Sequence, residues 1–180
     1  MNPKPYYQDL RKVKAIILGA DPSTGGKIQF EYVFGIDSKD NRYFASIERN
    51  LAVIGLARKD IYVQNMIQDY LIDETSKNKD WEKIAESWVP TLLKELDAFD
   101  PNRKIPVLVT AERIFNFLMD SKIYSAKEIY KGDIPLSNFE TNKLNRQLIP
   151  FYRHFYYSLK KEEWANYSQT ISHKVCRLKK

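Results

Sequence analysis

Short apolar runs, too brief to form helices, alternate along this chain with longer stretches whose apolar residues recur at helical spacing. The first short run is Val13–Leu18, and Gly19 ends it abruptly. Runs of this kind predict buried strands at 13–18, 61–63 and 105–109, with a less regular β segment at 30–34. The helical spacing predicts helices at 42–57, 81–96 and 111–119, and over much of 138–170.

Strands that alternate with helices favour an α/β fold of three layers, α/β/α, with a central four-stranded parallel sheet. Sites in such folds gather at the carboxyl ends of the strands, so the turn after Leu18 and the end of Val63 are the places to search. Two features interrupt the pattern. Pro90 predicts a kink or break in its helix, and residues 1–9, with two prolines, predict a loose tail before a single domain at 10–180.

The charge balance of the chain is basic. Its 29 lysines and arginines outnumber 23 aspartates and glutamates, which gives a formal charge of +6. This excess fits a polyanionic partner such as DNA, although a solvated basic surface explains it equally well. Cys176 is the single cysteine, so the sequence offers no internal disulfide and no Cys/His zinc cluster, and no apolar run is long enough to span a membrane. We therefore expect a cytoplasmic monomer without a metal, a cofactor or a membrane contact.

The motifs near these strands occur in the order found in uracil-DNA glycosylases. The turn Gly19-Ala20-Asp21-Pro22 resembles that family's Gly-Gln-Asp-Pro-Tyr turn, and Phe34 falls where the family keeps the aromatic that stacks on the extruded base. Asn65, after Tyr62-Val63-Gln64, resembles the base-reading asparagine, and Pro135-Leu136-Ser137 resembles the end of the DNA-inserting loop. The resemblance covers residues 13–137. It implies a uracil-DNA glycosylase-like fold and a DNA glycosylase that hydrolyses the N-glycosidic bond of an extruded uracil or related damaged base.

The resemblance also implies a role for each matched residue. Breaking the bond builds positive charge on the sugar and negative charge on the base, so Asp21 is the catalytic candidate that orients or deprotonates a water. The Asn65 carboxamide both accepts and donates, which suits the N3 hydrogen and O4 of uracil. The remaining candidates are Phe34, Ala20 and Ser23 for base binding, and Pro22, Leu136 and Ser137 for DNA binding.

Several positions depart from the family pattern. Ala20 replaces the glutamine, Ser23 replaces the tyrosine that excludes the thymine methyl, and Gly132 stands where the inserting loop would begin with its catalytic histidine. His154 resembles a different, later position, and His173 lies in the C-terminal tail. Whether the chain is an enzyme therefore stays open, and the alternative is a glycosylase-fold protein that binds nucleic acid without cutting it.

Each candidate also has a purely structural explanation. Asp21 could cap a turn, Asn65 could satisfy loop amides, and Phe34 could be an ordinary core residue. The Pro135-Leu136-Ser137 segment could be a simple turn. The glycine-rich segment 23–26 could present amides to a phosphate, but it lacks the usual nucleotide-binding patterns. A third interpretation is an α/β hydrolase or nucleotide-binding protein whose resemblance is accidental.

Overall fold

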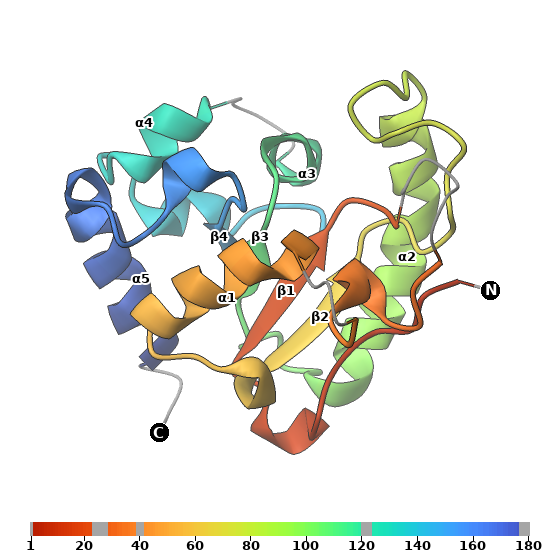
Figure 1. Cartoon of the computed structure of the whole chain (residues 1–180), viewed down its shortest axis with the longest axis horizontal. Helices are drawn as coiled ribbons and strands as arrows, with labels where there is room; N and C mark the ends of the chain where they lie inside the picture. Colours follow the sequence, from red (N-terminus) through yellow and green to blue (C-terminus); the bar gives the residue numbers. More distant parts are fainter. Residues whose placement is uncertain (1, 23–28, 39–41, 120–123, 177–180) are drawn as a thin grey trace.

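A computed structural model of the chain describes residues 2–22, 29–38, 42–119 and 124–176 (Figure 1). In this part of the chain the strands form one four-stranded, all-parallel sheet in the order β2-β1-β3-β4. Their bounds are Ala15–Gly19 for β1, Ile61–Asn65 for β2, Val107–Val109 for β3 and Leu148–Pro150 for β4. Every strand residue is buried, as expected for a parallel sheet covered on both faces. The predicted central four-stranded parallel sheet is confirmed.

Helices cover the sheet. The α-helices of the described residues are α1 (Arg42–Val53), α2 (Trp81–Phe99), α3 (Glu112–Leu118), α4 (Ala126–Tyr130) and α5 (Ala165–Cys176). In Figure 1, α1 crosses the near side of the sheet and α2 lies beyond it, which is consistent with three α/β/α layers. Short 3-10 helices complete the fold: η1 (Leu10–Lys12), η2 (Val33–Gly35), η3 (Arg58–Asp60), η4 (Leu136–Phe139), η5 (Phe155–Tyr157) and η6 (Glu162–Trp164). Among the described residues, no helix has the length and apolar character that crossing a membrane requires.

The strand order creates a switch point at the carboxyl edge of the sheet. From β1 the chain moves outward to β2, then returns past β1 to form β3 on its other side. The register places Gly19 of β1 beside Asn65 of β2, and Leu18 beside Val109 of β3. Crossovers that leave a strand in opposite directions open a crevice between their loops, and ligands of α/β proteins bind in such crevices.

The segment 30–34, which we predicted as a β segment, is not a strand. Tyr32 makes one isolated bridge to Lys4, and the chain then turns through η2. Phe34 and Gly35 both have positive φ angles, 60° and 59°, which are incompatible with an extended strand. The prediction failed because the apolar run contained no signal for a left-handed turn at a phenylalanine.

The fourth strand comes instead from residues 148–150, inside the region that we predicted to be largely helical. Between 138 and 164 the described chain forms β4 and short 3-10 turns. The regular helix of this region, α5, begins at Ala165. Strand β4 is three residues long, follows Arg146-Gln147 and precedes Phe151-Tyr152, so its sequence is too short to show a period of two. Its pairing with β3 decides its conformation.

Helix α2 continues through Pro90, so the chain does not break there; a kink, the other possibility that Pro90 raised, stays a prediction. Pro90 is exposed, and water can satisfy the carbonyl that the missing N–H leaves without an intrahelical partner.

The N-terminal residues do not form the loose tail that we predicted. Lys4 exchanges backbone hydrogen bonds with Glu31 and Val33, and Tyr6 exchanges a pair with Val63 of β2. Pro3 is buried and lines the pocket described below. Proline and polar residues at a chain end made the segment resemble a tail, but its backbone donors and acceptors are bound to the edge of the domain.

Candidate functional site

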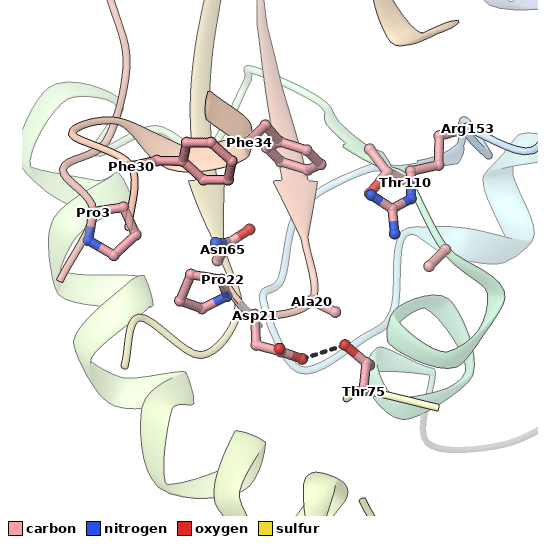
Figure 2. A pocket seen from close by; sticks show the side chains of 11 residues that line it. Pro3, Ala20, Asp21, Pro22, Phe30, Phe34, Asn65, Thr75, Thr110 and Arg153 are labelled. Atoms are coloured by element: carbon pink, nitrogen blue, oxygen red, sulfur yellow. Dashed lines mark hydrogen bonds between the residues drawn. The ribbon is translucent and has the colours of Figure 1, made fainter. Parts of the chain in front are cut away.

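A pocket opens at the carboxyl edge of the sheet (Figure 2). Each strand supplies a residue that follows or closes it: Asp21 after β1, Asn65 in β2, Thr110 after β3 and Arg153 beyond β4. The cavity measures about 90 Å³, room for roughly six to nine water-sized groups at about 10–15 Å³ each. That size suits one planar heterocycle.

The structure brings together five of the residues singled out in the sequence. They line this pocket as one group: Ala20, Asp21, Pro22, Phe34 and Asn65. They come from three separate segments: Asp21 from the turn after β1, Phe34 from η2 and Asn65 from the end of β2.

Two donors from other parts of the chain hold the Asp21 carboxylate in place. The Thr75 hydroxyl donates to its Oδ2 at 2.5 Å, and the indole Nε1 of Trp81 donates to the same oxygen at 3.0 Å. Trp81 is fully buried at the start of α2 and packs edge-on against Phe117, so its indole is fixed. The carboxylate therefore has a defined orientation at the pocket wall.

Arg113 of α3 fixes the segment that carries Thr75. Its guanidinium donates to both carboxylate oxygens of Glu82 at 2.7 Å, and to the backbone oxygens of Thr75 and Asn78. These hydrogen bonds to Glu82 raise the pKa of Arg113, and the negative charge of Asp21 adds to the same effect. The guanidinium also lies over the Trp81 ring, 5.2 Å from its centroid. One arginine thus supports both donors to Asp21.

Asn65 presents an amide that the protein itself does not use. The residue is only 2% exposed, yet within the described part of the chain no group hydrogen-bonds to its side-chain carboxamide. Its neighbour Gln64 is fully engaged, because its side chain accepts from the Asn65 backbone N–H and donates to Glu95 at 2.9 Å. Among the described residues, this carboxamide is not one of the fully buried side-chain groups that lack a hydrogen-bond partner. It lines the pocket, where a ligand can hydrogen-bond to it.

Phe34 forms an aromatic wall of the pocket. Its ring packs edge-on against Phe44 at 5.7 Å, and its backbone occupies the left-handed region, which costs a non-glycine residue on the order of 1–3 kcal/mol. Gly19 permits this arrangement. A Cβ at Gly19 would lie 2.3 Å from Asn65 Oδ1 and 2.4 Å from the Phe34 ring, so any side chain there would displace both pocket groups.

Six residues that line the pocket were not among the predicted site residues: Pro3, Phe30, Thr75, Thr110, Ala111 and Arg153. Thr110 is buried, and its hydroxyl donates to the Leu18 carbonyl at 2.9 Å, which ties the loop after β3 to the end of β1. The backbone N–H of Arg153 donates to the Thr110 carbonyl, which holds Arg153 beside this loop. Its side chain places a cation at the pocket wall. The rule that sites follow strand ends identifies Thr110 once its strand is recognised. It could not identify Arg153, because β4 was itself not predicted.

Other predicted site residues lie elsewhere. Leu136 is buried in η4, and its carbonyl accepts from the side chain of Gln147, the residue before β4. Ser137 is exposed beside it; neither residue lines the pocket, and their contact with DNA stays a prediction. Ser23 lies outside the described residues. His154 follows Arg153 but does not line the pocket.

No group of three or more histidine, cysteine, aspartate or glutamate side chains within residues 2–22, 29–38, 42–119 and 124–176 is arranged to hold a metal ion. Comparison with known proteins adds no relative, since no protein-family model matches the chain and no curated protein is significantly similar to it. The functional argument therefore rests on the pocket.

Proposed function

We propose that this chain is a nucleic-acid N-glycosylase that takes one extruded base, uracil or a related altered base, into the pocket and hydrolyses its glycosidic bond. The observation that carries the proposal is the Asn65 carboxamide, which has no protein partner among the described residues and lines one pocket with the Asp21 carboxylate. An amide acceptor and donor side by side match the edge of a pyrimidine or purine base.

The walls of the pocket fit a flat, weakly polar ligand. Phe34 and Phe30 supply aromatic faces, and Pro22 adds an apolar surface opposite them (Figure 2). Stacking on an aromatic ring contributes about 1–3 kcal/mol per base, and Asn65 would add hydrogen bonds that select among bases. The ring stacks any base, whereas the amide chooses one.

Asp21 is the group proposed to act on the sugar side of the bond. As the bond lengthens, the sugar becomes oxocarbenium-like, and a carboxylate beside it stabilises that charge and orients a water for attack on the anomeric carbon. The hydrogen bonds from Thr75 and Trp81 hold the carboxylate in this role. The water adds to the sugar, and its proton leaves through the carboxylate.

Arg153 is the group proposed to act on the base side. The departing base carries negative charge, and a cation or a hydrogen-bond donor at the pocket wall stabilises it. In the family that the sequence resembles, a histidine stabilises this negative charge, and no histidine occupies the expected position in this chain. The guanidinium of Arg153 lines the same pocket as Asp21 and provides the required positive charge.

The meeting of Asp21, Phe34 and Asn65 also supports a uracil-DNA glycosylase-like fold, which we propose on that ground. These residues lie up to 44 positions apart, 65 − 21, and they line one cavity.

The test is incubation of stoichiometric protein with oligonucleotides that each contain uracil, hypoxanthine or a thymine mismatch. We expect an abasic site from at least one substrate, and a loss of about 100-fold or more in rate for Asp21→Asn, the scale of a lost general base. The asparagine keeps an oxygen that can accept from Thr75 and Trp81, so the variant should fold like the wild type. A lower rate then reports the lost carboxylate and not unfolding. If no substrate yields an abasic site, the catalytic proposal is wrong; binding of the same oligonucleotides would then favour a glycosylase-fold protein without activity.

A further inference from the structure

Beyond the pocket, a second hollow shares part of its wall. Thr110, Ala111 and Arg153 line both, and the second hollow continues over the segment after β4. Three consecutive rings border it, those of His154, Phe155 and Tyr156, which we call the aromatic platform. A ligand that extends out of the pocket past Arg153 reaches this platform.

The platform is exposed although its backbone is anchored. Phe155 is 68% exposed and Tyr156 is 56% exposed, unusual values for large aromatic side chains. The Tyr156 carbonyl accepts from the Trp164 indole at 2.8 Å, and the neighbouring Tyr157 carbonyl accepts from Asn50 at 3.3 Å. The rings are therefore held outward by a fixed turn.

The geometry of the rings suits stacking. His154 and Tyr156 lie nearly parallel, 12° apart with centroids at 5.7 Å, and Phe155 is 4.8 Å from Tyr156. The Nζ of Lys161 lies 4.7 Å from the Tyr156 centroid and 5.9 Å from that of Phe155. Lys161 also approaches Glu163, at 3.9 Å, so its charge is partly compensated, while Arg153 adds a second cation at the pocket side.

From these observations we propose that the aromatic platform binds single-stranded nucleic acid, by stacking the unpaired bases that flank the one held in the pocket. The occupant must offer flat π faces to the rings and negative charge to Arg153 and Lys161, and a polynucleotide strand offers both. In a duplex the base faces are covered by their neighbours, so the platform selects single strands. The inference rests on the proposed function for the position of the strand, but the platform binds without any chemistry.

The experiment is fluorescence anisotropy with a labelled oligothymidylate, which contains no altered base, and with the same strand annealed to oligoadenylate. We expect the single strand to bind at least tenfold more tightly than the duplex. The double variant Phe155→Ala/Tyr156→Ala should weaken single-strand binding by about tenfold or more, the scale of one or two lost stacking contacts. Because both side chains are exposed, the variant should fold, as circular dichroism can verify.

Matched controls separate this inference from the proposed function. Tyr7→Ala removes another exposed tyrosine, 44% exposed, and should not change oligothymidylate binding. Equal affinity for single strand and duplex, or binding that survives the double variant, would overturn the platform. Platform-dependent binding without base release would leave this inference standing and count against the glycosylase. Base release by the wild type, together with unaltered affinity of the double variant for the single strand, would support the glycosylase and overturn the platform.

Discussion

The indole nitrogen of Trp81 donates a hydrogen bond to Asp21 Oδ2 at 3.0 Å, joining the first residue of α2 to the turn after β1 across 60 positions of sequence, 81 − 21. Thr75 donates to the same oxygen. These donors hold the carboxylate in one orientation. A group that is already oriented does not lose rotational freedom on reaching the transition state, so the barrier is lower.

The first prediction concerns these two donors. Thr75→Val removes one hydrogen bond and keeps the shape of the side chain, whereas Trp81→Phe removes the other and leaves a smaller ring. Each should lower kcat by about 10-fold to 100-fold, given about 1.5–3 kcal/mol for a hydrogen bond to a charged group. KM should change little, because the base contacts are intact. Single-turnover kinetics measure the effect.

Controls for this prediction come from residues of the same kind outside the site. Thr170→Val, on the exposed surface of α5, and Trp88→Phe, on α2, should leave the rate unchanged. A wild-type kcat in the double variant Thr75→Val/Trp81→Phe would mean that Asp21 acts without these two hydrogen-bond donors.

The second prediction concerns pH. The hydrogen bonds from Arg113 hold the pKa of Glu82 below its ordinary value of 4.5, although burial works in the opposite direction. Since the pKa is lowered in the folded protein, the ion pair stabilises the fold above pH 4.5, and this contribution is lost as the pH falls through the folded-state pKa. Glu82 is half-exposed, so the effect should stay within about 1 kcal/mol.

Urea unfolding of the wild-type protein and of Glu82→Gln measures this dependence. The difference between the two should be present at neutral pH and should shrink below pH 4.5, as the pH falls through the lowered pKa of Glu82. A difference that grows toward acid pH would contradict the assignment. Glu162→Gln, which changes a carboxylate of η6, is the control.

The third prediction concerns the buried arginine that precedes β4. Arg146 is 1% exposed, and its guanidinium donates to the carboxylates of Asp97 and Asp100 at the end of α2. Asp100→Asn should destabilise the protein by about 1–3 kcal/mol, because it removes one of the two carboxylates that compensate the buried guanidinium. Arg103→Gln removes a partly exposed ion pair to the same Asp97 and should cost no more than about 1 kcal/mol. Denaturant unfolding of the two variants should separate them clearly; equal losses would contradict the difference in burial.

The fourth prediction gives stability and function opposite signs. Asn65→Leu removes an amide that has no protein partner in the described residues and puts an apolar group of similar size on the pocket wall. Stability should be unchanged or slightly higher, while recognition of the altered base should be lost. Thermal unfolding and single-turnover assays on the same sample measure both. A large drop in stability would show that the amide serves the fold.

The sequence was sufficient to predict those parts of the fold whose signal is local. β1, β2 and β3 were predictable because short apolar runs end at glycine, asparagine or threonine, and the helices between them have clear apolar faces. The rule that parallel strands expose their carboxyl ends together then predicted that Asp21 and Asn65 lie close in space, and they line one pocket.

The remainder depends on contacts between distant segments. Thr75 lies in a polar stretch with no periodicity, and only Arg113, 38 positions later, places it beside Asp21. Arg153 could be assigned only after β4 was known to pair with β3. The positive φ of Phe34 reflects its packing against Phe44 and Gly19, which no propensity describes.

The most direct test of the central claim follows release of the free base by chromatography, from a single strand that contains the preferred altered base, with wild-type protein and with Asp21→Asn. The account predicts release by the wild type, a rate at least about 100-fold lower for the variant, and equal binding of the strand by both. Equal release by the two proteins would remove Asp21 from the chemistry. Tight binding by both with no release by either would show a protein that recognises a base without excising it.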